Sequence, residues 1–76
     1  MNKARRKSIT AILDAIQQHI IDLEAIRDEE QEAFDNLPES LQEAERGQSM
    51  QEAIDALDEA ISSTTDAADH LANLSE

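Results

Sequence analysis

Two histidines, His19 and His70, are the residues of this sequence best suited to bind a metal or transfer a proton near neutral pH. His70 follows Asp66 by one helical turn, and an imidazole and a carboxylate at that spacing can share a metal ion. A folded hairpin would bring Asp14 near this pair. However, His19 has no comparable partner, and the Glu-x-x-His spacing of metal-binding helical bundles does not occur. We therefore expect no metal site and no cofactor, and interpret His19 as a structural residue beside an apolar stripe.

Residue types needed for covalent or phosphate chemistry are scarce. The 76 residues include no Cys, one Gly and one Phe. The sequence thus offers no thiolate nucleophile, no disulfide framework and no glycine-rich phosphate loop. No Ser/His/Asp constellation or pair of catalytic carboxylates is recognisable, so we predict that the protein is not an enzyme. The lack of cysteine and of a signal-peptide pattern predicts a cytoplasmic protein.

Charge is the strongest compositional signal. Eighteen acidic residues and six basic ones give a net charge of −12. Four of the basic residues, Lys3, Arg5, Arg6 and Lys7, lie at the start, so residues 8–76 carry a net charge of −16. Such an acidic body repels nucleic acid and anionic membranes and favours cationic protein surfaces. We expect a protein partner, with a basic protein as one candidate, and neither a membrane partner nor direct binding to nucleic acid.

The candidate docking face consists of acidic residues from both halves of the sequence: Asp28, Glu29, Glu30, Glu32, Asp55, Asp58 and Glu59. Runs of charge are usually solvated helix faces. Here almost no Lys balances the carboxylates, and their mutual repulsion lowers stability, which weakens that interpretation and keeps a docking role open. The basic residues at the N-terminus keep two interpretations: contact with nucleic acid, or neutralisation by Asp69 and Glu76 of the same chain or by a second copy.

Apolar residues recur at helical spacing in two segments, separated by Gln, Asp and Glu, and no strand-like alternation occurs. The sequence predicts one all-α domain, residues 1–76, with a basic arm at 1–7 and helices over 8–35 and 48–75. The two long helices should form an antiparallel helical hairpin. We expect a seam for self-association or a partner, formed by Ile9, Ile12, Leu13, Ile16, Ile20, Leu23, Phe34, Met50, Ile54, Leu57, Ile61 and Leu71.

The corner of the hairpin is predicted at residues 36–47, which contain the only Pro and the only Gly. A residue before proline avoids the α conformation, so the first helix should end by Leu37. Asn36 suits a left-handed helix end. The five residues PESLQ that begin at Pro38 predict a short helical turn, and Gly47 closes the corner or lies near the start of the second helix.

The register of the hairpin follows from this corner. If the corner centres near Gln42, the residue numbers of any two facing residues add up to about 84. Phe34 should therefore face Met50. The second helix departs from a pure heptad pattern at Ser62–Thr65, which should weaken the seam there. Each apolar stripe spans three heptad positions, which is wider than a two-stranded coiled coil requires. This width predicts a homodimer that forms a four-helix bundle, or a partner helix that fills the groove.

The sequence from Arg27 onward, RDEEQEAFDNLPESLQEAERGQSMQEAIDALDEAISS, together with the opening NKARRK, resembles a group of small acidic helical proteins of bacteriophages and mobile elements of Gram-positive bacteria. The similarity is strongest at FDNLPESLQ and ERG. The resemblance implies a phage or prophage setting inside a bacterial host cell, where small acidic proteins often bind and block host machinery.

Two functions are compatible with these features. The first is a protein-binding module that acts through a self-associating helical hairpin. The alternative is an anti-defence inhibitor that imitates nucleic acid, whose carboxylates block a basic nucleic-acid-binding surface of a host protein. The wide apolar stripes favour the first, because acidity alone fits both.

Overall fold

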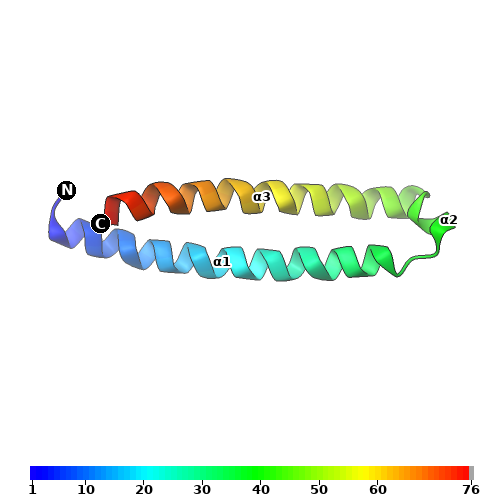
Figure 1. Cartoon of the computed structure of the whole chain (residues 1–76), viewed down its shortest axis with the longest axis horizontal. Helices are drawn as coiled ribbons and strands as arrows, with labels where there is room; N and C mark the ends of the chain where they lie inside the picture. The colour runs from blue at the N-terminus through cyan, green and yellow to red at the C-terminus, as the bar shows by residue number, and fades with distance from the viewer. Residues whose placement is uncertain (76) are drawn as a thin grey trace.

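The structure is a computed structural model that describes residues 1–75, and it contains helices α1 (Lys3–Asp35), α2 (Glu39–Gln42) and α3 (Glu45–Ser75). The long helices α1 and α3 lie side by side and antiparallel, with α2 at the corner and both termini at the other end (Figure 1). The Cα atoms span 58 × 14 × 13 Å, so the protein is a rod. The predicted all-α helical hairpin is confirmed.

Helix α1 begins at Lys3, five residues before the predicted start at residue 8. The reason is Asn2, whose side-chain Oδ1 accepts a hydrogen bond from the backbone N–H of Arg5 at 2.8 Å. An asparagine in this position satisfies one of the free N–H groups at a helix start. Residues 3–7 of the predicted basic arm therefore belong to the first turns of α1.

The corner begins where α1 ends, three residues before Pro38. Asn36 keeps right-handed backbone angles (φ −83°, ψ −6°), and no described residue has a positive φ, so the left-handed end predicted there is wrong. Pro38 caps α2: its carbonyl oxygen accepts bonds from the N–H groups of Leu41 at 2.8 Å and Gln42 at 3.0 Å. The predicted short helical turn is thus confirmed.

Gln42 caps the end of α1 from the neighbouring helix. Its side-chain Nε2 donates to the carbonyl oxygens of Phe34 at 3.1 Å, Leu37 at 3.2 Å and Asp35 at 3.5 Å. The last turn of α1 has no basic residue that could serve these carbonyls. The carbonyl oxygen of Phe34 also accepts from the backbone N–H of Leu37 at 3.0 Å. The amide of Gln42 thus adds a donor to carbonyl oxygens at and just after the end of α1, where intrahelical partners run out.

Gly47 lies inside α3, which begins at Glu45, three residues before the predicted start at 48. Gly47 is buried, and a Cβ at this position would overlap the carbonyl oxygen of Gln42 and lie 2.5 Å from its carbonyl carbon. Only glycine allows α3 to approach the backbone of α2 this closely. Gly47 is therefore a packing position of the corner.

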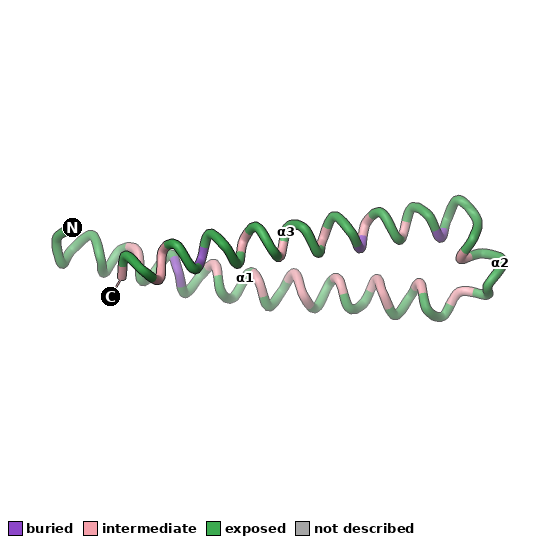
Figure 2. Tube along the Cα trace, turned by 45° about the horizontal axis from the view of Figure 1, so that its top comes forward, coloured by how far each residue is buried: buried purple, intermediate pink, exposed green. Residues whose placement is uncertain are grey.

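The seam between the long helices follows a continuous heptad pattern. Buried and half-buried residues recur at alternating steps of four and three, on the sides where the helices face each other (Figure 2). The seam residues in and just after α1 are Ile9, Leu13, Ile16, Ile20, Leu23, Arg27, Glu30, Phe34 and Leu37. In α3 they are Gly47, Met50, Ile54, Leu57, Ile61, Thr64, Ala68, Leu71 and Ser75. Four further half-buried residues lie next to a seam position: Glu24, Gln31, Ala53 and Ala72.

The register of the seam agrees with the prediction. Nη1 of Arg27 lies 3.0 Å from Oδ1 of Asp58, and these residue numbers total 85, one more than expected. The heptad pattern also runs through the segment predicted to depart from it, because Thr64 occupies a seam position. Its hydroxyl donates to the carbonyl oxygen of Ala60 at 2.6 Å, so the polar group is satisfied within its own helix.

The seam buries few side chains completely. Among the described residues, the buried hydrophobic ones are Leu13, Ile54 and Ala68. Most other seam residues keep between about a tenth and a third of their surface exposed. Two helices shield only the stripe that each turns toward the other, so a single hairpin leaves much of its apolar surface in contact with water.

The first prediction concerns Gly47→Ala. In an ordinary exposed helix this change stabilises by about 0.5–1 kcal/mol. Here we expect a loss of about 1–3 kcal/mol, because the new Cβ collides with rigid backbone. Urea unfolding followed by circular dichroism measures the change, with Gln48→Ala, an exposed neighbour, as the control. A Gly47→Ala protein as stable as the wild type would contradict this account of the corner.

The second prediction concerns the cap from Gln42. Gln42→Ala should lower the free energy of unfolding by about 1–3 kcal/mol, because the carbonyl of Leu37 loses its donor and that of Phe34 keeps only the backbone N–H of Leu37. Gln42→Glu should cost at least as much, since a carboxylate cannot donate and carries negative charge at a helix C-terminus. Gln17→Ala, at an exposed site within α1, is the control. Wild-type stability of Gln42→Glu would refute the capping role.

Candidate interaction surfaces

One side of the rod is apolar. In an antiparallel helix pair, the residues directly before every second seam position flank the seam, and they lie on the same side of the pair in both helices. In α1 these seam positions include Leu13 and Ile20, and in α3 they include Ile54 and Ile61. On α1 the flanking row is Arg5, Ile12, His19, Ile26 and Ala33, and on α3 it is Arg46, Ala53, Ala60, Ala67 and Leu74. We call the eight residues after the two arginines the apolar side. His19 is its polar member, and an arginine begins each row.

The apolar side contains exposed large side chains. Ile12 is 54% exposed, Ile26 is 51% exposed and Leu74 is 47% exposed. Of the twelve residues predicted for a self-association or partner seam, eleven are buried or half-buried within the hairpin, and Ile12 lies outside the seam between the long helices. Ile21 is equally exposed, at 58%, but lies on the opposite side of α1. The heptad pattern of the sequence had already separated them, since it included Ile12 in an apolar stripe and left Ile21 outside it.

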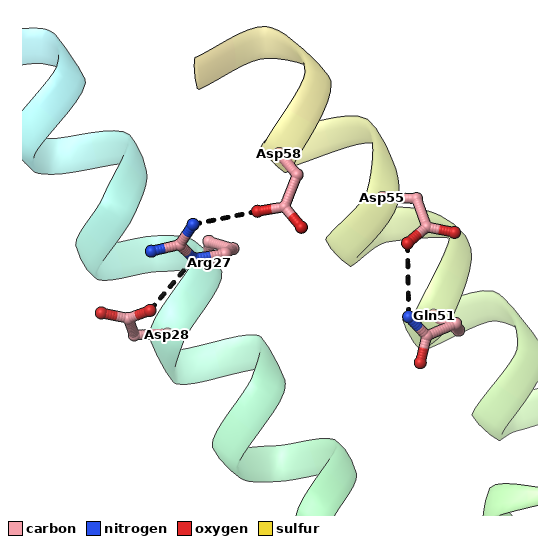
Figure 3. Close-up of polar contacts among 5 residues, drawn as sticks. All are labelled: Arg27, Asp28, Gln51, Asp55 and Asp58. Carbon is pink, nitrogen blue, oxygen red and sulfur yellow. Dashed lines mark hydrogen bonds and ion pairs between the residues drawn. The ribbon is translucent and has the colours of Figure 1, made fainter. Parts of the chain in front are cut away.

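The opposite side of the rod carries two ion pairs of Arg27, one within α1 and one that joins α1 to α3. Nε of Arg27 contacts Oδ1 of Asp28 at 3.0 Å, and Nη1 contacts Oδ1 of Asp58 at 3.0 Å (Figure 3). The hydrogen bond to Asp58, followed by that to Asp28, raises the pKa of Arg27, so its charge is permanent. Arg27 occupies a seam position and thereby links α1 to α3 on this side, which we call the polar side.

Amide side chains hold several other carboxylates. Nε2 of Gln51 donates to Oδ1 of Asp55 at 3.3 Å (Figure 3), and Nε2 of Gln31 donates to Oδ1 of Asp35 at 3.0 Å. Each pair joins residues one helical turn apart, a spacing that stabilises a helix by about 0.2–0.5 kcal/mol. These amides provide hydrogen bonds without neutralising charge, so the carboxylates remain available to a cation.

The seven predicted docking residues do not form one face. Asp28, Asp55 and Asp58 share the polar side, but Glu30 is half-buried in the seam. The others are exposed at different angles around their helices: Glu29, Glu32 and Glu59. The acidic surface therefore wraps around the rod, a feature that heptad positions could have revealed.

Charge is separated along the length of the rod. By the register above, residues 22–62 form the half that contains α2, which we call the corner half. It carries fourteen acidic and two basic residues, a net charge of −12. The remaining described residues, 1–21 and 63–75, form the open half, with four basic and three acidic residues. One end is strongly negative and the other is nearly neutral.

The basic residues of the open half lie at the start of α1. Lys3, Arg5, Arg6 and Lys7 are all exposed. Within residues 1–75, every ion pair involves Arg27, so the expected neutralisation by Asp69 is not seen, and Glu76 lies outside the described residues. The first turn of α1 also has no acidic residue to balance them. These four charges are available to another molecule.

The described residues contain no group of three His, Asp or Glu side chains placed to hold a metal ion, and no pocket was detected among them. None of the helices over residues 3–75 combines the length and the apolarity needed to cross a membrane. No protein-family model, curated protein or solved structure matches the chain. The surfaces described above are therefore the basis for a functional argument.

Proposed function

We propose that the protein is a non-enzymatic protein-binding module that self-associates through its apolar side and presents its acidic surface to a basic protein. Two hairpins that bring their apolar sides together form a four-helix bundle. The observation that carries the proposal is the division of the rod: exposed Ile12, Ile26 and Leu74 lie on one side, and the polar contacts of Arg27 lie on the other. The phage setting in a bacterial cytoplasm is part of this proposal.

The dimensions of the apolar side suit a second copy. Ile12 to Ala33 spans about 32 Å at 1.5 Å per residue, and two helices are about 20 Å wide. A contact of this length and width buries roughly 600 Å² on each copy, which reaches the lower end of stable protein interfaces. The small residues Ala53, Ala60 and Ala67 allow close approach of a facing helix.

Self-association leaves the acidic surface accessible. Asp28 and Asp58 lie on the polar side, away from the proposed contact, and Glu32 and Glu59 lie on the outer edges of their helices. A dimer would thus present carboxylates on several exposed surfaces. Cationic protein surfaces are the partners that such a charge distribution attracts.

The third prediction tests self-association. Sedimentation equilibrium at physiological salt should give a dimer for the wild type. Ile26→Asp should raise the dissociation constant about a hundredfold, because it places an unpaired carboxylate among apolar side chains. Ile21→Asp, the matched control on the other side of α1, should associate like the wild type. Ile20 and Ile61 are unsuitable for this test because they are half-buried in the seam.

Two results would reject this proposal. A folded wild-type monomer at all concentrations would show that the apolar side does not bind a second copy. Equal weakening by Ile21→Asp and Ile26→Asp would show that association does not use the apolar side. Circular dichroism should report unchanged helix content in both variants, since both isoleucines are already exposed.

A second candidate function is imitation of nucleic acid, favoured by the linear charge of the corner half. Half of the 58 Å rod carries a net charge of −12, or about one negative charge per 2.4 Å. Duplex DNA carries about one per 1.7 Å of helix axis. In this function, the corner half would occupy a basic groove that otherwise binds DNA.

The fourth prediction tests whether a basic partner binds the acidic residues of the corner half or responds only to the net charge of the protein. The probe is a labelled peptide of about twenty residues rich in Lys and Arg, measured by fluorescence anisotropy. The triple variant Glu29→Gln, Glu32→Gln, Glu59→Gln should weaken binding several-fold more than the triple variant Asp14→Asn, Asp66→Asn, Asp69→Asn, which removes the same charge from the open half. Equal losses would exclude a localised docking surface. For the nucleic-acid mimic, binding must also fall steeply with salt and compete with duplex DNA.

A further inference from the structure

We infer that two copies pack with opposite orientations, so that the start of α1 in each copy, which carries Lys3, Arg5, Arg6 and Lys7, lies at the level of the acidic corner half of the other. This inference rests on the proposed self-association and specifies its geometry. It assigns the basic start of α1 to the surface of a second copy. Each copy would then cover part of the other's negative charge.

Symmetry allows two ways to join the apolar sides of two identical rods. A two-fold axis along the rod gives a parallel dimer, in which both corners lie at the same end and α1 faces α3 of the partner. A two-fold axis across the rod gives an antiparallel dimer, in which the corners lie at opposite ends. In that arrangement α1 faces α1 and α3 faces α3.

The apolar contacts fit both arrangements. In the antiparallel dimer, α1 helices that overlap fully have residue 19 at their midpoint, so Ile12 lies opposite Ile26 of the partner copy. In the parallel dimer, Ile12 lies near Leu74 of the partner copy, at the same end of the rod. Both contacts join exposed apolar side chains. Hydrophobic burial therefore permits association without choosing its orientation.

Charge chooses the orientation. A parallel dimer places one corner half, at −12, beside another, and the basic starts of the two α1 helices together at the other end. An antiparallel dimer places each basic start beside a corner half. Helices in contact are about 8–10 Å apart, close to the Debye length of about 8 Å at physiological salt. Neighbouring charges thus still interact across the contact, whereas charges at opposite ends of the rod are screened.

The start of α1 needs such a neighbour. Positive charge at a helix N-terminus is unfavourable beside the helix dipole, and no acidic residue of the first turn offsets it. Arg5 lies two helical turns before Ile12 and therefore on the apolar side. With residue 19 at the midpoint, Arg5 of one copy lies level with Ala33 of the other and about one helical turn from Glu29, an exposed carboxylate of the corner half.

The fifth prediction measures orientation directly. Because the chain has no cysteine, Ser40→Cys in the exposed corner accepts a single spin label. In the antiparallel dimer the two labels lie at opposite ends, about 60 Å apart, since each is about 21 residues of helix from the midpoint. In the parallel dimer they lie within about 25 Å, or two helix diameters. Double electron–electron resonance on the dimer separates these distances.

The outcomes distinguish the two proposals. A distance near 60 Å supports the antiparallel dimer. A distance below about 25 Å in a confirmed dimer overturns the orientation but leaves self-association intact. A labelled protein that sediments as a monomer, like the unlabelled wild type, gives no dipolar signal and overturns the proposed self-association itself, and the orientation with it.

A charge variant tests the contact that sets the orientation. Replacement of Lys3, Arg5, Arg6 and Lys7 by Gln should raise the dimer dissociation constant at least tenfold at physiological salt, and the difference should shrink near 1 M salt. The control, Arg5→Lys with Arg6→Lys, keeps the charge and should associate like the wild type. If the neutral variant associates as tightly as the wild type, the basic residues do not contact the partner copy.

Discussion

The close approach of Gly47 to the backbone of Gln42 is the constraint on which the rest of this structure depends. It fixes where α3 begins relative to α2, and the amide of Gln42 fixes where α1 ends. One added or lost residue at this corner would rotate α3 by about 100° about its axis relative to the seam. Ile54 and Ala68 would then leave the seam, and the distinction between apolar and polar sides would be lost.

Once the register is fixed, the geometry of two packed helices determines which side chains are buried between them and which stay exposed. Each helix can turn one stripe toward the other, and this stripe includes the charged residues Arg27 and Glu30. Meanwhile Ile12 and Ile26 stay outside it, about half exposed. A hairpin that folded only as a monomer would gain from the reverse arrangement, with apolar residues in the seam and charged ones outside. This distribution is the physical reason to propose a second copy.

The sequence was sufficient to predict the helices, the antiparallel pairing, the short turn at Pro38 and the register to within one residue. These features follow from helical periodicity and from the backbone restriction of proline, which act locally. The early start of α1 was missed because the cap is a single residue, Asn2. The roles of Gly47 and Gln42 were missed because both depend on the approach of segments in three dimensions.

The candidate surfaces were predicted less completely than the fold. A stripe three heptad positions wide indicated surplus apolar surface. However, periodicity alone does not distinguish a residue inside the hairpin seam from one beside it, so Ile12 was grouped with residues that the hairpin itself buries. The acidic residues were grouped by their proximity in sequence. The helix distributes them around its axis, as Glu30 in the seam and Asp58 on the polar side demonstrate. The heptad position of a residue gives the direction in which its side chain leaves the helix. Only side chains that point in similar directions can contact the same partner.

The placement of charge connects the two proposed activities. Two bodies that each carry −12 repel one another, so an apolar side alone is a weak basis for association. In the monomer, basic residues at the start of α1 are also unfavourable, by about 0.3–1 kcal/mol for each charge near the helix end. Against the corner half of a second copy the same residues become favourable. Because that contact would use the apolar side, it would leave Glu32 and Glu59 at the outer edges of the rod, where a basic partner could still reach them.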